Sequence, residues 1–171
     1  APVEALDTLE LAQSLYPDRE EGYRQYAYAL YLNGDYQACV DYGESCPFPR
    51  DGQILLTVAS AYFEQGEYEQ AARDFYDGAQ SFEMNADHLR DYAVCLGRTG
   101  DIDGAEEVLE ELTGLGASPE VTAYVQGEVA YAKGEYAQAE ADFQSALDQA
   151  RDDALIRRCC LSLAETYRDG A

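Results

Sequence analysis

Residues 124–147 read YVQGEVAYAKGEYAQAEADFQSAL, and a glycine followed by an acid and a tyrosine stands near the middle of this stretch. The same signal, a glycine followed by an acid and an apolar residue, occurs four times in the chain. Its copies are Gly34-Asp35-Tyr36, Gly66-Glu67-Tyr68, Gly100-Asp101-Ile102 and Gly134-Glu135-Tyr136. Successive glycines are 32, 34 and 34 residues apart. A nearly constant period of this length predicts an array of stacked supersecondary units.

Residues at fixed distances from each of these glycines are similar in size. An alanine or cysteine follows the glycine by five positions and a small residue precedes it by seven, while a large residue precedes it by four, except at Ala130. Intervals of three and four within each segment are typical of helices. We therefore expect each glycine to end a helix in the left-handed conformation and the following acid to cap the next helix. Each period then forms an antiparallel helix pair.

These units resemble the tetratricopeptide repeat, whose motif combines a large residue, Leu-Gly or Leu-Ala, an aromatic residue, a Gly-Asp-Tyr turn, an alanine, a second aromatic residue and another alanine. The best copies lie at residues 124–147 and 55–79, where the second reads LLTVASAYFEQGEYEQAARDFYDGA. Residues 23–46 and 89–112 also fit the motif. In the copy at 23–46, Gly43 replaces the aromatic residue, so we expect its second helix to be weaker.

The resemblance implies an all-α fold, namely a right-handed α-α superhelix (α-solenoid) of antiparallel helix pairs. It predicts a single array over residues 1–171. The predicted parts are a second helix of a preceding unit at 1–17, four full units at 20–50, 52–84, 86–118 and 120–151, and a terminal helix at 154–169. Such an array begins and ends halfway through a helix pair. We expect either a fragment of a longer array or end helices that act as caps.

The charge of the chain restricts its partners. Acidic residues number 34 against 11 basic ones, which gives a net charge of −23, and Lys133 is the only lysine. A surface this acidic repels phosphate groups, so we expect no nucleic-acid partner and no direct membrane contact. No run of 18 apolar residues is present, so no membrane span is predicted. The acidity either supports solubility or attracts a basic protein or peptide.

The five cysteines are an odd number and form no C-x-x-C motif, which argues against a disulfide framework and a zinc knuckle. Cys39 and Cys95 fall where the pattern requires small apolar residues, so we expect buried free thiols. Free thiols slightly favour a cytoplasmic location. The alternative is the soluble part of an exported or membrane-anchored protein.

No motif of a known catalytic or nucleotide-binding site is present. His88 is the only histidine, and it is expected near the start of a helix. Residues 100–104 read GDIDG, but the glycine spacing of a calcium loop is absent, and the repeat turn explains them. The sequence therefore predicts a protein that is not an enzyme, with no cofactor and no metal site.

In the tetratricopeptide family the first helix of each pair lines the concave face, so the resemblance implies candidate residues for a peptide groove. These candidates are Arg24, Tyr28, Tyr31, Leu56, Phe63, Arg90, Arg98, Tyr124, Glu128 and Tyr131. Ser60, Val94, Leu161, Glu165 and Arg168 occupy further groove positions. The predicted function is a non-enzymatic interaction scaffold that binds a peptide segment of a partner protein. The alternatives are a structural or oligomerisation spacer and a regulatory module of a longer signalling or transcription protein. We expect the chain to be a monomer or a weak oligomer that associates through its end helices.

One subtype of the family is excluded by its residues. Co-chaperone members hold a peptide's terminal carboxylate with lysines and asparagines on the groove helices. The matching positions here carry Arg24, Tyr28, Thr57, Asp87 and Asp91. Since none is lysine or asparagine and two are acids, binding of cytosolic chaperone tails is not expected.

Overall fold

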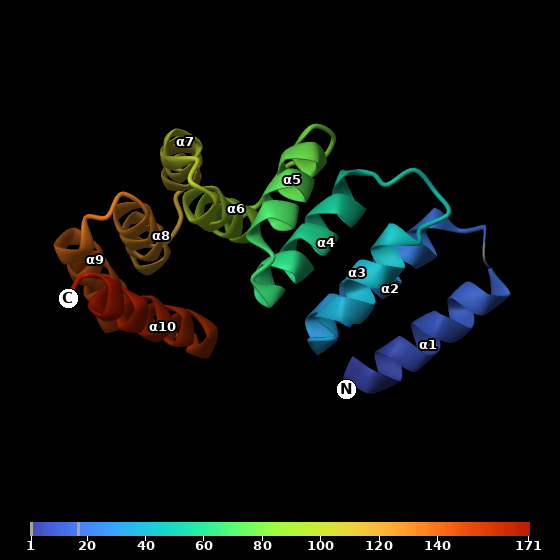
Figure 1. Cartoon of the computed structure of the whole chain (residues 1–171). Coiled ribbons are helices and arrows are strands. Elements are labelled where there is room, and N and C mark those ends of the chain that lie inside the picture. The colour runs from blue at the N-terminus through green and yellow to red at the C-terminus, as the bar shows by residue number, and fades with distance from the viewer. Residues whose placement is uncertain (1, 17) are drawn as a thin grey trace. The chain divides into compact units, whose positions relative to one another are not determined.

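The computed structural model describes residues 2–16 and 18–171, and its described residues form helices and no strands (Figure 1). The helices are α1 (Pro2–Leu15), α2 (Glu20–Asn33), α3 (Tyr36–Glu44), α4 (Gly52–Gln65), α5 (Tyr68–Ala79), α6 (Ala86–Thr99), α7 (Ile102–Gly114), α8 (Pro119–Ala132), α9 (Tyr136–Gln149) and α10 (Asp153–Asp169). The all-α prediction is confirmed. Ala1 and Pro17, which belong to the predicted leading helix, lie outside the described residues.

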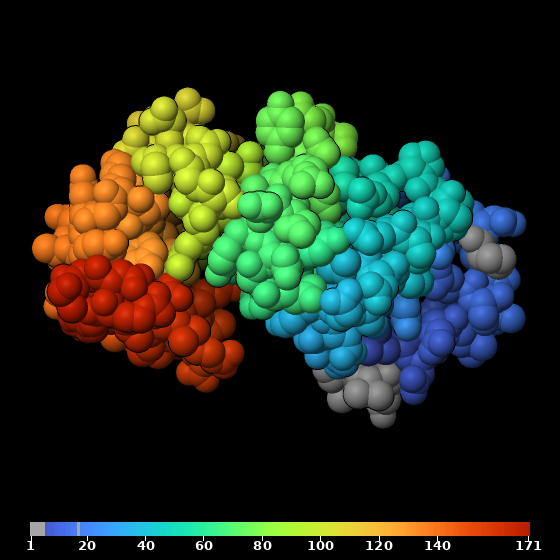
Figure 2. Space-filling view, viewed as in Figure 1, coloured from blue at the N-terminus to red at the C-terminus, as the bar shows by residue number. Residues whose placement is uncertain are grey.

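The chain divides into two compact units, residues 1–84 and 85–171. In the first unit, α2 pairs with α3 and α4 with α5, while α1 packs against α2. In the second unit, α6 pairs with α7 and α8 with α9, and α10 packs against α9, as Figure 2 shows for the red and orange segments. Each predicted full unit contains one of these four helix pairs. Their union into a single array over 1–171 stays a prediction.

The four turn glycines have the left-handed conformation that the sequence predicted. Their φ angles are +83° at Gly34, +78° at Gly66, +90° at Gly100 and +77° at Gly134. The amide of the residue after each glycine bonds back into the preceding helix, as Asp35 does to the carbonyl of Leu30 at 3.0 Å. A glycine is favoured here because a side chain disfavours positive φ.

The predicted capping role of the acids is confirmed at Asp101 alone, whose carboxylate accepts the amide of Gly104 at 3.0 Å. The prediction is wrong at Asp35, Glu67 and Glu135, which make no side-chain cap bond. Asp35 instead accepts a bond from the side chain of Asn33 at 2.7 Å. The two glutamates belong to a longer residue type that is not among the preferred caps.

Small residues allow the paired helices to approach closely, as predicted. The alanines and the cysteine five positions after the turn glycines are fully buried, and they are Cys39, Ala71, Ala105 and Ala139. A methyl group added at Gly127 would lie 2.6 Å from the ring of Phe143. At Gly43 it would lie 2.3 Å from a Val58 methyl, so Gly43 lets α3 pack against α4. The nine residues of α3 also make it the shortest of the described helices.

The cysteines of the structure are free thiols. Cys39 and Cys95 are buried, as predicted, and Cys159 is buried as well. Burial raises the pKa of Cys39 to about 12 and that of Cys159 to about 11. Among the described helices, none combines the length and the apolar composition that crossing a membrane requires.

Candidate peptide-binding surface

The first helix of each pair carries the predicted groove residues, and the two units place them in different environments. In the first unit they lie on α2 and α4. In the second unit they lie on α6 and α8, with further positions on α10.

Helix α2 exposes an aromatic face. The rings of Tyr28 and Tyr31 stack with their centroids 6.4 Å apart and an interplanar angle of 24°. Tyr28 is 46% exposed, whereas Tyr31 is half-buried because it also contacts the ring of Tyr36. Leu32, four positions after Tyr28, is 62% exposed, and the sequence interpretation did not include it. Its spacing from Tyr28 could have revealed it, since residues four apart share a helix face.

Arg24 lies on the same helix, but carboxylates surround its guanidinium. One Nη atom lies 2.6 Å from the carboxylate of Asp51, and further ion pairs join it to Glu20 and Glu21. Asp51 caps α4 by accepting the amide of Ile54 at 3.1 Å. Burial raises the pKa of Asp51, but its bonds to Arg24 and to backbone amides outweigh burial and leave the pKa lowered. Arg24 thus links α2 to the start of α4.

The candidates on α4 are part of the interior. Leu56 and Phe63 are buried, as is Ser60, whose hydroxyl donates to the carbonyl of Leu56. Phe63 contacts the ring of Tyr68 edge to face at 5.9 Å. These side chains support the first unit from within.

In the second unit a buried carboxylate joins three helices. Glu128 of α8 is only 2% exposed and lies 2.8 Å from a guanidinium nitrogen of Arg98 on α6. The same guanidinium contacts Glu165 of α10 at 2.6 Å. The hydroxyl of Ser162, also on α10, donates to Glu128. Glu128 therefore has partners on both neighbouring first helices.

A second cluster of charges lies around Asp91 of α6, which is also 2% exposed. Its carboxylate lies 2.8 Å from Arg90 on the same helix and 2.7 Å from Arg158 on α10. Two contacts thus join α6 to α10, namely Arg98–Glu165 and Asp91–Arg158. In each of them the two residues are 67 positions apart, which is about two repeat lengths. We call these two clusters, Arg90, Asp91, Arg158 and Arg98, Glu128, Ser162, Glu165, the ionic ladder of the second unit.

The surroundings of the ladder keep its arginines charged. Burial lowers the pKa of Arg98, but the carboxylates of Glu128 and Glu165 outweigh this and raise it overall. The same balance, with Asp91 as the main carboxylate, raises the pKa of Arg90. Tyr124 is buried beside the ladder, and burial raises its pKa well above the usual value. The arginines and carboxylates of the ladder therefore form a network of paired charges.

Tyr131 lies next to this ladder and remains half-buried. The guanidinium carbon of Arg98 is 4.9 Å from the centre of its ring, which is a cation–π contact. Its hydroxyl donates to Asp169. The structure therefore brings Arg98, Glu128 and Tyr131 together, and all three have partners within the second unit.

The comparisons with known proteins agree with this architecture. A family model described as YpiA-like, C-terminal tetratricopeptide repeats matches residues 53–116. No curated protein matches the chain in sequence.

Several solved structures share the fold at low sequence identity. YrrB, described as a TPR protein with an unusual peptide-binding site, superposes with a TM-score of 0.67 at 15% identity over 94% of this chain and 84% of its own. TTC0263 of Thermus thermophilus gives 0.62 at 22% identity over 93% and 89%. A tetratricopeptide repeat protein of Parabacteroides merdae gives 0.67 at 18% identity over 98% and 70%. With its repeated turn motif and its helix pairs, the chain has the α-solenoid fold of tetratricopeptide-repeat proteins, and its residues 53–116 match a model of such repeats.

Proposed function

We propose that the chain is a non-enzymatic protein–protein interaction scaffold and that it holds a peptide segment of its partner on the α2 face, defined as Tyr28, Tyr31 and Leu32. The observation that carries this proposal is the exposed Tyr28, stacked on the half-buried Tyr31 of the same first helix. Tetratricopeptide repeats are generally interaction scaffolds, and YrrB, which shares the fold, is described as having a peptide-binding site.

The chemistry of the α2 face suits a peptide. Tyrosine offers a large apolar area with few rotatable bonds, and its hydroxyl can bond a peptide backbone group. Leu32 extends this apolar surface by one residue with a well exposed side chain. A short apolar or aromatic segment would bury these side chains at a small entropic cost.

The ionic ladder makes the matching face of the second unit a weaker candidate. A peptide that used Arg90, Arg98 or Glu128 would have to replace ion pairs that are already formed. Leaving one partner of a buried ion pair unpaired typically costs about 3–5 kcal/mol, so the peptide would have to supply an equivalent charge. These costs favour the α2 face as the first contact. In the second unit, Tyr131 is half-buried, while Leu161 on α10 is 61% exposed.

The net charge of −23 bears on the partner. Charges of opposite sign accelerate encounter, while like charges slow it. The α2 face would therefore bind fastest to an apolar or aromatic segment that is flanked by basic residues. An acidic partner would be disfavoured.

The test is a selection of peptides from a displayed random library on the whole chain, followed by titration of the selected peptide. Tyr28→Ala should weaken binding by about 2 kcal/mol, or roughly thirtyfold in Kd, as expected for a truncated aromatic anchor. Tyr31→Ala should have a similar effect. Tyr76→Ala on α5 is the matched control, because Tyr76 is a 59% exposed tyrosine of the same unit on a second helix. If the selected peptide binds Tyr28→Ala and Tyr31→Ala with the same Kd as the unmodified chain, the α2 face is not its binding site.

A second candidate, self-association, is favoured by exposed apolar residues on α1. Leu11 and Leu15, four positions apart, are strongly exposed together with Tyr16. Repulsion between copies of this acidic chain opposes association, so added salt should promote it. Light scattering at low and high salt tests this function. A monomer at both salt concentrations would contradict it.

A further inference from the structure

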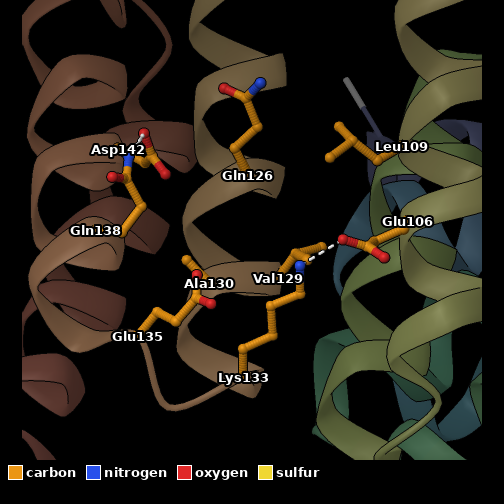
Figure 3. Close-up of a pocket in the computed structure, with 9 residues that line it drawn as sticks. All are labelled: Glu106, Leu109, Gln126, Val129, Ala130, Lys133, Glu135, Gln138 and Asp142. Atoms are coloured by element: carbon orange, nitrogen blue, oxygen red, sulfur yellow. Dashed lines mark hydrogen bonds and ion pairs between the residues drawn. The ribbon is translucent and has the colours of Figure 1, made fainter.

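Helices α7, α8 and α9 enclose a surface hollow of about 290 Å³, which Figure 3 shows. Apolar side chains of Leu109, Val129 and Ala130 form part of its lining. Carboxylates lie around it: Glu106 comes from α7, and Asp142 comes from α9 on the other side of α8. This hollow involves none of the residues of the α2 face or of the ionic ladder.

The hollow lies where the repeat pattern is broken, at Ala130. The position four before the turn glycine is large in the other units, where it is Leu30, Tyr62 or Leu96. In the first unit, Tyr62 occupies the equivalent place and packs against the core, and its hydroxyl donates to Glu44 at 2.5 Å. Alanine is smaller than leucine or tyrosine, and Ala130 is one of the residues that line the hollow.

Two aspartates at the same repeat position differ in burial. Asp142 and Asp74 are both eight residues after their turn glycine. Asp74, near the Tyr62 side chain, is buried and only 7% exposed, whereas Asp142 beside Ala130 is partly exposed. Tyr62 also shows what fills such a place: a long side chain with an apolar body and a polar end that bonds a carboxylate.

We propose that this hollow binds an arginine or lysine side chain projecting from a basic segment of a partner protein. The aliphatic stem would cover Leu109, Val129 and Ala130, and the cationic head would contact a carboxylate at the rim, either that of Asp142 or, in place of Lys133, that of Glu106. Charge complementarity favours a cation over a neutral aromatic side chain, because the lining carries three carboxylates, including Glu135, and one ammonium group. Long cationic side chains commonly combine apolar stem contacts with a charged head at the rim.

Lys133 supports the choice of a cation. Its ammonium group pairs with Glu106 at the edge of the hollow, drawn as a dashed line in Figure 3. The rim thus already attracts a primary ammonium ion supplied by the chain itself. Because Lys133 occupies Glu106, it competes with an incoming cation, and its removal should strengthen binding of an external one.

The experiment uses NMR amide shifts of the whole isotopically labelled chain, titrated with N-acetyl-arginine-N-methylamide. The matched probe without charge is N-acetyl-norleucine-N-methylamide. Saturable shifts are expected at the amides of Leu109, Val129, Ala130 and Gln138 with the arginine probe, and not with the norleucine probe. Lys133→Gln should lower the Kd of the arginine probe by about threefold, because an exposed ion pair of modest strength is removed.

Ala130→Leu is the decisive variant, since it fills the hollow and leaves the net charge unchanged. Leucine occupies the same repeat position at residues 30 and 96, so the fold accepts it there. The Kd should rise by at least about tenfold, as expected when the apolar contacts are lost. Asp142→Asn should raise it by about threefold, whereas Glu107→Gln, the same loss of charge at an exposed α7 residue outside the lining, should leave it within about twofold.

Two results would overturn the proposal. One is an unchanged Kd in Ala130→Leu, which would mean that the probe responds to the diffuse negative potential. The other is an equal rise in the Kd of the arginine probe in Asp142→Asn and Glu107→Gln. That result would also mean that the probe responds to the diffuse negative potential, and it could be obtained even if Ala130→Leu failed to fold. The α2 face shares no residue with this site, so loss of peptide binding there leaves this test unaffected.

Discussion

The guanidinium of Arg158 lies 2.7 Å from the carboxylate of Asp91, although 67 residues separate the two in sequence. Asp91 belongs to α6 and Arg158 to α10, and α8 packs against both helices. The arginine thus spans two repeat lengths to reach a carboxylate that is almost fully buried. Together with the Arg98–Glu165 pair, this contact links α10, the last helix of the second unit, to α6, the first helix of that unit.

Loss of this link should destabilise the second unit. We expect Arg158→Leu to lower the free energy of unfolding by about 1–3 kcal/mol, because Asp91 then keeps Arg90 as its only cationic contact among those the structure describes. Urea denaturation followed by circular dichroism measures this. Arg157→Leu is the control, since Arg157 is the exposed neighbour on the same helix. Equal effects of the two substitutions would mean that the buried link contributes nothing specific.

His88 should make the start of α6 sensitive to pH. Its Nδ1 accepts the Asn85 amide at 3.4 Å while Asn85 Oδ1 accepts the His88 amide at 2.9 Å, a capping box that requires a neutral imidazole. Burial lowers the pKa of His88, and the nearby Asp91 and Asp87 oppose this only in part. Since the folded pKa lies below the unfolded value of 6.5, the contribution is complete above that pH and is lost as the pH falls through the folded pKa.

The stability change between about pH 7.5 and about pH 5.5 should therefore be smaller in His88→Gln than in the unmodified chain. Glutamine keeps the capping box but has no proton to gain. The difference should be on the order of 1 kcal/mol or less, the usual contribution of a cap. Thermal melts of both proteins at the two pH values measure it, and parallel pH dependences would show that His88 has no part in it.

Glycines within the helices should respond in opposite directions to the same substitution. Gly127→Ala places a methyl group 2.6 Å from the ring of Phe143, so it should cost about 1–3 kcal/mol of stability through overpacking. Gly114→Ala meets no atom within 4 Å and should be neutral or stabilising by up to about 1 kcal/mol. Melting temperatures of the two variants test the predicted helix contact. A neutral Gly127→Ala would mean that α8 and α9 pack less closely than the structure places them.

The features that follow from backbone conformation or from close packing were predictable from the sequence. The left-handed glycines follow from the φ angles that only glycine adopts easily, and the buried alanines follow from the space between paired helices. The capping acids were predicted less well, because Asn33 competes for the carboxylate of Asp35. Such competition depends on side-chain geometry that a repeat motif does not specify.

The groove candidates show the same limit. Their helix and their face follow from the repeat register, but their accessibility depends on partners elsewhere in the chain. Arg98 and Glu128 satisfy one another and take further partners on α10. Ser162 bonds Glu128, about one repeat length away, and Arg158 bonds Asp91, about two repeat lengths away. The family motif leaves these positions variable, so only a comparison of residues at those spacings could have suggested the two pairs.

The five thiols should differ widely in their rates of alkylation, which tests the burial of the helix-pair contacts. Cys160 is exposed and should react first, whereas Cys39 and Cys159 are buried and burial raises their pKa values to about 12 and about 11. At about pH 8, a thiol of pKa about 11 is ionised in only about one molecule in a thousand, and the thiolate is the reactive form. Mass spectrometry after brief treatment with iodoacetamide should therefore find Cys160 modified while Cys39, Cys95 and Cys159 remain intact until urea is added. Early modification of Cys39 would show that α3 opens readily from its unit, in line with its short length.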